Sequence, residues 1–321
     1  MTAVQRAIKE AFPELELQFD EELAPLTYMK IGGPAEVLLK IADRKQLQEL
    51  VEFATEHEIP LRILGGASNV LISDAGLKGL VIFWTGTGYQ KSTHPNAAGK
   101  FVVTAETGWK TALLVRKTID DGLAGLEGFL GVPGTLGGAV YNNAHYQRQL
   151  IGEFVQRIQV LKPSGEFHWM TRAEAEFSYD HSIFQSKPDI IVQVELALET
   201  GEKAHSLQLI KEATEYRAKT QPLGEPSSGC YFRNPKNTPE LQKKFPQFAD
   251  RTEISGAFLI DQAGLKGFQI GQVQVSQKHA AFLINLGGGS SADVCAVAEE
   301  IQERVAKQFG VQLEPEVFFL E

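Results

Sequence analysis

The sequence is poor in cysteine, and its histidines are scattered. Only two cysteines occur in 321 residues, Cys230 and Cys295, which provides neither a disulfide framework nor the paired spacing of a zinc site. The seven histidines include no pair at the i, i+4 spacing by which one helix face holds a metal. We therefore predict no metal ion, and so few cysteines fit a reducing cytoplasm.

Long apolar runs and an excess of positive charge are absent as well. No hydrophobic stretch approaches the roughly 20 residues of a membrane span, and the net charge of −9 lacks the basic field that a nucleic acid or an anionic membrane would need. Residues 1–12 follow a helical pattern of charged and apolar residues, unlike a signal or transit peptide. We expect a cytoplasmic globular protein without nucleic-acid or membrane partners, and the sequence indicates no protein partner.

Apolar periodicity and turn signals predict an α+β protein of three parts. Polar, turn-rich segments at 91–99 and 199–204 suggest the divisions 1–90, 91–203 and 204–321. Helices are expected at 1–12, 43–58 with Asp43 as N-cap, 110–121, 205–219, 254–263 and 291–309. Strands are expected at 36–41, 61–64, 69–72, 79–83, 101–105, 154–161, 166–169, 190–199, 281–285 and 311–319.

Two glycine-rich loops carry the strongest functional signal. One is Leu64–Ile72, and the other is Gly131–Asn143, in which four glycines fall within eight residues. Glycine lets backbone N–H groups approach a ligand closely, and clustered N–H groups attract pyrophosphate. The first loop fits neither the G-x-G-x-x-G pattern nor a triphosphate-binding loop. One extended ligand such as a flavin dinucleotide, touching both loops, is the economical interpretation, and a tight packing turn is the alternative for the second.

A cysteine and two glutamates are candidates for proton chemistry. Cys230 follows a glycine in a proline-flanked loop with Arg233 nearby, and a thiol near a cation ionises more readily. The alternative is an inert, buried cysteine, which is the interpretation we adopt for Cys295. Strand alternation over Leu313–Val317 would place Glu314 and Glu316 on one face. Either one of them is a proton-relay acid, or both are charges that keep an exposed edge strand soluble.

Taken together, these segments resemble the UDP-N-acetylenolpyruvoylglucosamine reductase (MurB) family. The resemblance extends over almost the whole chain as an ordered set of motifs, and the order is more specific than any single motif. The motifs are Lys30–Ala35, Leu64–Asn69, Ser73–Gly76, Gly125–Gly128, Gly131–Gly138, Arg217–Pro222, Gly229–Pro235, Asp261–Gly267, Lys278–Ala280 and Leu313–Val317.

The resemblance implies a two-lobed FAD-binding fold of the vanillyl-alcohol-oxidase type, followed by a C-terminal α/β substrate-binding domain. It implies reduction by NADPH and then reduction of UDP-N-acetylglucosamine enolpyruvate in peptidoglycan precursor synthesis. By resemblance, Cys230 is the proton donor and Glu316 lies near the substrate carboxylate. The expected FAD contacts are Gly65, Gly66, Ala67, Ser68 and Asn69 at the pyrophosphate, and Gly131, Gly134, Thr135, Gly137 and Ala139 beside the ring. The expected substrate-binding residues are Arg217, Arg233, Asn234, Lys278 and His279.

Two segments depart from the family pattern. Where the family has Tyr-Arg-x-Ser, this chain has Tyr179-Asp-His-Ser182, so Asp180 occupies a catalytic position as a carboxylate that would repel developing negative charge. Protonated His181 or Arg217 are the cations expected to compensate. Residues 142–147 also replace the expected Asn-x-Gly-Ala-Tyr-Gly. These departures leave two alternatives: a flavin- or UDP-sugar-binding protein that has lost turnover, and an oxidoreductase of the same fold with another substrate.

Overall fold

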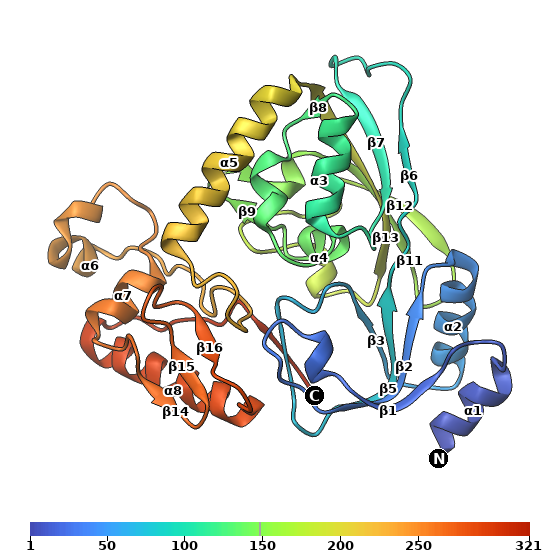
Figure 1. Ribbon diagram of the computed structural model, residues 1–321, viewed down its shortest axis with the longest axis horizontal. Helices are drawn as coiled ribbons and strands as arrows, with labels where there is room; N and C mark the ends of the chain where they lie inside the picture. The colour runs from blue at the N-terminus through green and yellow to red at the C-terminus, as the bar shows by residue number, and fades with distance from the viewer. Residues whose placement is uncertain (148) are drawn as a thin grey trace. The chain divides into compact units, whose positions relative to one another are not determined.

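The computed structural model describes residues 1–147 and 149–321, and it divides into two compact units (Figure 1). Unit 1 comprises Met1–Glu21, Ala35–Gly66 and Lys78–Arg217. Unit 2 comprises Glu22–Pro34, Ala67–Leu77 and Ala218–Glu321. Two short stretches of the N-terminal half therefore belong with the C-terminal residues. The division at 1–90, 91–203 and 204–321 stays a prediction.

The first part of unit 1 is built on a four-stranded sheet in the order β1-β2-β5-β3. Its elements are α1 (Ala3–Ala11), β1 (Gln18–Glu22), β2 (Pro34–Ile41), α2 (Arg44–Glu56), β3 (Leu61–Leu64) and β5 (Leu77–Trp84). The Asp43 side chain accepts hydrogen bonds from the amides of Lys45 and Gln46, which confirms it as the N-cap of α2. Leu47 and Leu50 of α2 are buried against Leu80 and Ile82 of β5 in one hydrophobic cluster.

A second sheet of unit 1 is antiparallel, with the order β12-β11-β13-β7-β6 and β8 added to β13. Its strands are β6 (Tyr89–Lys91), β7 (Phe101–Glu106), β8 (Leu123–Ala124), β11 (Val155–Leu161), β12 (Phe167–Thr171) and β13 (Ile190–Thr200). The helices beside it are α3 (Thr111–Asp120) and α4 (Leu136–Tyr141), and a short hairpin is formed by β9 (His145–Tyr146) and β10 (Gln149–Leu150). Gly122 follows α3 with φ +74°, as expected of a glycine just past a helix end.

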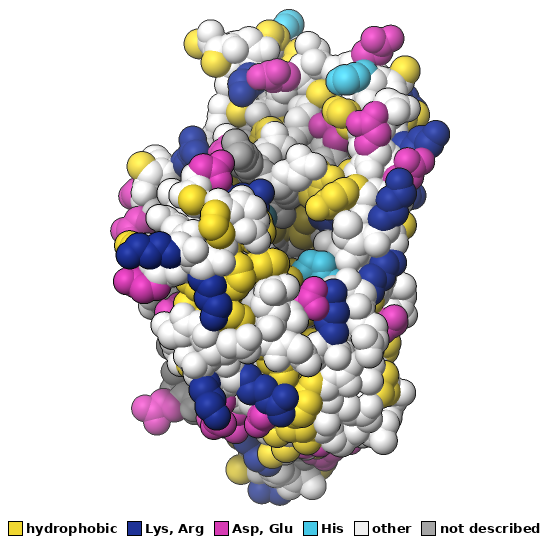
Figure 2. Space-filling model, turned by 90° about the vertical axis from the view of Figure 1, so that its left-hand side faces the viewer, with side chains coloured by type: hydrophobic (Ala, Val, Ile, Leu, Met, Phe, Trp, Pro, Cys, Tyr) yellow, Lys and Arg dark blue, Asp and Glu magenta, His cyan; other side chains and the backbone are white. Residues whose placement is uncertain are grey.

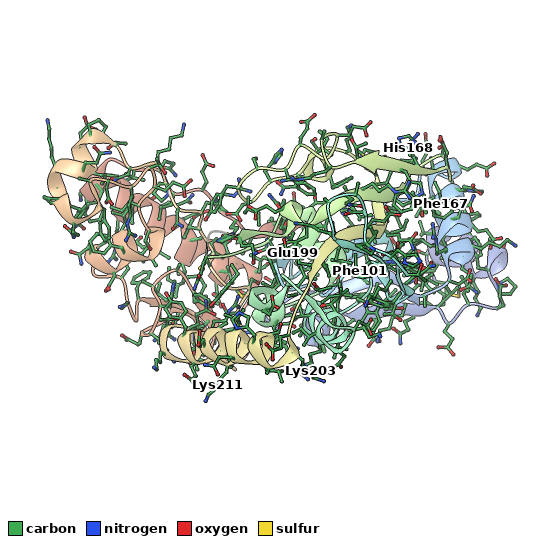
Figure 3. The ribbon with its side chains drawn as sticks, turned by 90° about the horizontal axis from the view of Figure 1, so that it is seen from above. Phe101, Phe167, His168, Glu199, Lys203 and Lys211 are labelled. Atoms are coloured by element: carbon green, nitrogen blue, oxygen red, sulfur yellow. The ribbon has the colours of Figure 1, made fainter. Side chains whose placement is uncertain are left out.

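Helix α5 (Lys203–Thr220) is largely exposed, and Ser206 is its buried residue. The Ser206 hydroxyl donates a 2.6 Å hydrogen bond to the buried carboxylate of Glu127. In Figure 3, Lys203 and Lys211 extend from the outer side of α5. The helix is therefore anchored through a polar contact and its C-terminal arginine, described below, more than through an apolar stripe.

Unit 2 combines a small antiparallel sheet with three α-helices that lie wholly within it. Its elements are α6 (Pro239–Lys244), α7 (Gly256–Gln262), β14 (Gln269–Ile270), β15 (Val273–Val275), β16 (Leu283–Asn285) and α8 (Ser291–Phe309). A separate parallel pair joins β4 (Val70–Ile72) to β17 (Phe318–Leu320). Helix α8 begins with a capping box between Ser290 and Asp293 and ends at Gly310, whose φ is +68°. Short 3-10 turns occupy Ala24–Leu26, Glu127–Gly131, Ile151–Glu153, Ile183–Gln185 and Pro246–Phe248.

The prediction of the last strand is wrong over most of its length. A strand was expected at 311–319, but β17 begins only at Phe318. Pro315 has no N–H to donate, and its segment makes only an isolated bridge with Phe232. The alternation argument that put Glu314 and Glu316 on one strand face therefore lacks its regular strand. The sequence analysis also missed β1, β6, β14, β15, α4 and α6, which are short.

Charges of both signs are mixed on one face of the molecule. On the face coloured in Figure 2, Lys and Arg side chains alternate with Asp and Glu. Among the described residues, none of the helices combines the length and the apolar character that crossing a membrane requires.

Candidate functional site

The two glycine-rich loops meet in unit 1. A Cβ placed on Gly65 would lie 2.2 Å from Thr135 Oγ1, and a Cβ on Gly66 would lie 2.3 Å from Gly134 Cα. Neither distance is sterically possible, so both positions require glycine for the loops to touch. One ligand can touch both loops, as the sequence analysis expected, only if the loops lie this close together. Part of the glycine requirement nevertheless comes from loop-to-loop packing, which was the alternative for the second loop.

Backbone hydrogen bonds hold the second loop in place. The Gly137 N–H donates to the Thr107 carbonyl at 2.9 Å, and the Leu136 N–H donates to the Trp109 carbonyl at 2.8 Å. Thr135 is buried and caps α4 by accepting from the Gly138 N–H. The loop is thus a preformed scaffold against which a cofactor's planar ring could rest, although the expected contacts of Ala139 and its neighbours stay predictions.

Arg217 is anchored on the second loop. Its guanidinium donates to the carbonyl oxygen of Gly131 and lies 5.1 Å from the ring centroid of Tyr146. A Cβ on Gly131 would come within 2.8 Å of Arg217 Nε, so the arginine side chain would have to shift to admit one. The planar guanidinium can stack and donate at the same time, which a lysine cannot. The predicted substrate-binding arginine and the predicted cofactor loop are therefore adjacent.

Asp180 lies in a tight, buried turn of unit 1. Its side chain is 4% exposed, its φ is +49°, and its Oδ1 lies 3.1 Å from His145 Nδ1. His145 is a partner that the sequence analysis did not select, since it named His181 and Arg217 as the compensating cations. His181 instead forms a backbone bridge with Ser178. Both departures from the family pattern, at 142–147 and at Asp180, thus contact each other.

Cys230 and Glu316 lie on paired extended segments of unit 2. The Glu316 N–H donates to the Tyr231 carbonyl at 2.8 Å, and the Arg233 N–H donates to the Glu314 carbonyl at 3.0 Å. These two bonds flank the Phe232–Pro315 bridge. On its other side, Cys230 forms an isolated bridge with Phe282. Both Cys230 and Glu316 are half-buried, and neither cysteine of the described chain forms a disulfide.

The first glycine-rich loop crosses the boundary between the units after Gly66. Ala67 is buried with φ +46°, and Asn69 belongs with Glu316 in unit 2. The Asn69 amide donates to the Glu316 carbonyl at 3.2 Å, and the Phe318 N–H donates to the Asn69 carbonyl at 3.1 Å. Asn69 therefore orients the backbone that carries Glu316, a role that its loop position alone did not indicate.

The matches to known families bear on both units. Residues 35–171 match the model of an FAD binding domain, and residues 221–320 match that of the UDP-N-acetylenolpyruvoylglucosamine reductase C-terminal domain. The chain is 35% identical over 312 residues to the UDP-N-acetylenolpyruvoylglucosamine reductase of Streptococcus agalactiae, an alignment that covers 97% of each protein. The chain belongs to the UDP-N-acetylenolpyruvoylglucosamine reductase family.

Further members of the reductase family agree along the whole chain. The reductase of Pediococcus pentosaceus is 35% identical over 314 residues, covering 98% of this chain and 97% of its own. The crystal structure of the Thermus caldophilus reductase superposes with a TM-score of 0.75 at 30% identity, covering 96% of this chain and 99% of that one. The predicted resemblance and the predicted fold class, an FAD-binding fold with a C-terminal domain, are confirmed.

The residues present fit the FAD that this reductase family's N-terminal domain binds. Gly65 and Gly66 keep the loop free of Cβ atoms where it meets Gly134 and Thr135, so main-chain groups of both loops converge. Such a cradle suits pyrophosphate and a flat ring. The family match supports FAD binding by residues 35–171, and the placement of FAD at these two loops stays a prediction.

The remaining residues predicted to bind the substrate are spread over unit 2. His279 lies against Phe282 with ring centroids 4.9 Å apart, and burial, with Lys266 adding to it, lowers the pKa of His279. The Lys278 ammonium donates to the Ala218 carbonyl at 2.6 Å. The Asn234 side-chain oxygen accepts from the Gly256 N–H at the start of α7, a structural role.

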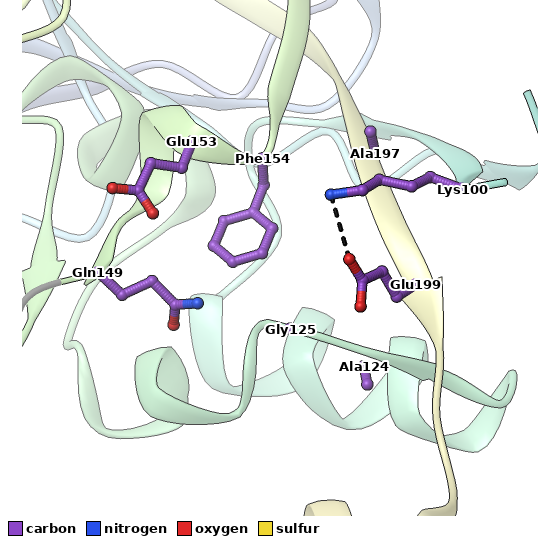
Figure 4. A pocket seen from close by; sticks show the side chains of 8 residues that line it. All are labelled: Lys100, Ala124, Gly125, Gln149, Glu153, Phe154, Ala197 and Glu199. Atoms are coloured by element: carbon purple, nitrogen blue, oxygen red, sulfur yellow. Dashed lines mark ion pairs between the residues drawn. The ribbon is translucent and has the colours of Figure 1, made fainter. Parts of the chain in front are cut away.

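Unit 1 has a surface pocket of about 250 Å³ (Figure 4). Its lining includes an ion pair of 3.3 Å between Lys100 and Glu199, with Phe154 on the opposite wall. None of the predicted site residues lines it. Within the described residues, no group of three or more His, Cys, Asp or Glu side chains is arranged to hold a metal ion.

Proposed function

We propose that the chain is a cytoplasmic, FAD-dependent reductase that uses NADPH to reduce UDP-N-acetylglucosamine enolpyruvate to UDP-N-acetylmuramate in peptidoglycan precursor synthesis. Its family membership supports this activity, since the relatives carry the name UDP-N-acetylenolpyruvoylglucosamine reductase. The observation that carries the proposal is the pairing of the Cys230–Arg233 segment with Glu314–Glu316 in unit 2. This pairing supports a thiol and a carboxylate acting together.

In the proposed reaction, Cys230 is the proton donor. FAD, when bound, supplies a hydride to the β-carbon of the enolpyruvyl group. Negative charge then builds on the α-carbon and its carboxylate and requires both stabilisation and a proton. Cys230 gives its thiol proton to the α-carbon, so that one hydride and one proton convert the carbon–carbon double bond to a lactyl ether. Glu316, near the substrate carboxylate, is the acid of the proton relay.

The binding groups follow from the same proposal. The backbone of Gly65, Gly66, Ala67, Ser68 and Asn69 holds the pyrophosphate, and Gly131, Gly134, Thr135, Gly137 and Ala139 lie beside the ring. Arg217, Arg233, Asn234, Lys278 and His279 bind the anionic UDP-sugar. With a net charge of −9 over the whole chain, these few cations and the backbone dipoles must supply the local attraction.

Separate anaerobic half-reactions test the proposal. The purified protein should be yellow, lose its flavin absorbance with NADPH, and recover it when UDP-N-acetylglucosamine enolpyruvate is added without oxygen. NADH run in parallel tests the choice of donor. A colourless protein that takes up no added FAD, or recovery of colour only with oxygen, would contradict the proposed reaction.

A second candidate is a binding protein on the same scaffold that has lost turnover. The buried carboxylate of Asp180 favours it, because a buried negative charge opposes charge build-up on a nearby substrate. This candidate predicts flavin binding and UDP-sugar binding without anaerobic recovery of colour. Asp180→Arg would then increase the oxidative half-reaction, whereas a loss would indicate that Asp180 is built into a rearranged site.

A further inference from the structure

The turn that carries Asp180 is pinned to the segment that carries His145. The Asn143 amide donates to the Ser178 carbonyl at 2.6 Å, and the Ser182 hydroxyl donates to the Tyr141 carbonyl at 2.6 Å. The Gln185 amide donates to the Asp180 carbonyl at 3.0 Å. Asn143 and Ser182 are fully buried. These bonds hold Asp180 in its left-handed conformation, a geometry that a non-glycine residue keeps only when its surroundings enforce it.

The imidazole ring of His145 is held through its Nδ1 atom. The Asp180 carboxylate lies 3.1 Å from Nδ1, and the Tyr179 ring lies 4.9 Å from the imidazole, centroid to centroid. A carboxylate at Nδ1 favours the form with a proton on that atom, and it stabilises the doubly protonated ring. Nε2 then becomes the nitrogen that gains or loses a proton. The His145 side chain is 29% exposed, so solvent and ligands can reach it.

The pair lies beside the predicted ligand site of unit 1. His145 is followed in β9 by Tyr146, whose ring would be only 2.4 Å from a Cβ on Gly128. The same ring lies under Arg217, which donates to Gly131 of the second glycine-rich loop. Tyr146 therefore connects the short strand that carries His145 to the arginine of the loop.

We propose that Asp180 and His145 form a carboxylate–imidazole dyad, in which protonated His145 binds an anionic group of the substrate through Nε2 and Asp180 is the positioning residue. The inference rests on the proposed function for the identity of that substrate. Asp180 then offsets charge on His145 and fixes its ring, and it does not face the substrate as an unpaired carboxylate. Among the described residues, the other titratable or charged groups near these two segments are Tyr141, Tyr146, Tyr179, His181 and Arg217.

Binding to the oxidised protein tests the dyad without turnover. The dissociation constant of UDP-N-acetylglucosamine enolpyruvate is measured by flavin absorbance or calorimetry at pH 6 and pH 8.5. We expect the wild-type affinity to fall about tenfold over this range, the value of one charge-assisted hydrogen bond. His145→Gln should bind weakly at both pH values with most of this pH dependence gone. Asp180→Asn should reduce the ratio of the dissociation constant at pH 8.5 to that at pH 6. The matched control, His181→Gln, should keep the wild-type ratio.

Two results would overturn the dyad. One is a wild-type ratio retained by His145→Gln, and the other is loss of the ratio in His181→Gln. Thermal melts of each variant identify folding defects, and Asp180→Glu provides a second, carboxylate-retaining variant that should keep part of the ratio. If the substrate binds with the expected pH dependence but is never reduced, the dyad stands and the proposed reaction fails, so the two can be distinguished.

Discussion

The amide N–H of Glu316 donates a 2.8 Å hydrogen bond to the carbonyl oxygen of Tyr231, the residue that directly follows Cys230. This bond joins segments that are more than eighty residues apart in the sequence. Burial, with Cys295 adding to it, raises the pKa of Tyr231 to about 12, so its phenol is a weaker acid than an ordinary tyrosine. The proton donor proposed for this place is therefore the neighbouring thiol.

Replacing Cys230 with alanine should separate the two half-reactions. Flavin reduction by NADPH should keep its rate, whereas reoxidation by the enolpyruvyl substrate should slow by about 10²- to 10⁴-fold, the usual contribution of a general acid. Stopped-flow absorbance under anaerobic conditions measures both rates. Cys295→Ala is the matched control and should leave both unchanged, because Cys295 lies in α8 packed against the hydrophobic core of unit 2. Equal slowing of both half-reactions by Cys230→Ala would contradict its role as the proton donor.

Alanine at Gly66 should disrupt the contact between the two loops. Its Cβ would lie 2.3 Å from the Cα of Gly134, so the backbone must shift, at a cost of about 1–3 kcal/mol in unfolding free energy. A lower Tm and a reduced content of bound flavin are expected. Gly138→Ala is the control, because its Cβ would be 3.9 Å from Thr135 Oγ1 and alanine favours the helix. Matching Tm values for the two variants would argue against loop-to-loop contact.

Lysine at position 217 should weaken the anchor of α5 on the second loop. The guanidinium both donates to the Gly131 carbonyl and stacks on Tyr146, and an ammonium cannot reproduce this pair of contacts. We expect a loss of about 1–2 kcal/mol in unfolding free energy, measured by urea denaturation. Arg116→Lys, on the exposed side of α3, should change it by less than about 0.5 kcal/mol. Equal stability of the two variants would show that the Arg217 contacts contribute nothing measurable.

The stability of the protein should fall in mild acid, partly because of His279. Burial and Lys266 lower the pKa of His279 below its ordinary value, so the unfolded chain binds this proton more readily than the folded chain. The contribution is present above about pH 6.5 and is lost as the pH falls towards the lowered pKa. Urea denaturation from pH 7.5 to 5.5 should show a smaller decline for His279→Gln than for wild type. His94→Gln, at an exposed position, should follow wild type, and identical slopes for all three proteins would exclude this contribution.

Local features were predictable from short stretches of sequence. Asp43 caps α2, and Gly122 takes a left-handed conformation just past α3, because the responsible contacts lie within a few residues. Most long helices and strands appear near their expected positions for the same reason. The predicted strand at 311–319 fails because its backbone partners, near Tyr231 and Asn69, are distant in sequence and interrupted at Pro315.

The order of motifs was enough to identify the reductase family and to mark both glycine-rich loops, since spacing and residue type are properties of the chain before it folds. Folding alone decided which side chains became neighbours. It placed His145 against Asp180, and it paired Glu316 with the residue after Cys230. Such contacts depend on where separate turns and strands meet in three dimensions, and no local hydrogen-bonding preference encodes that meeting.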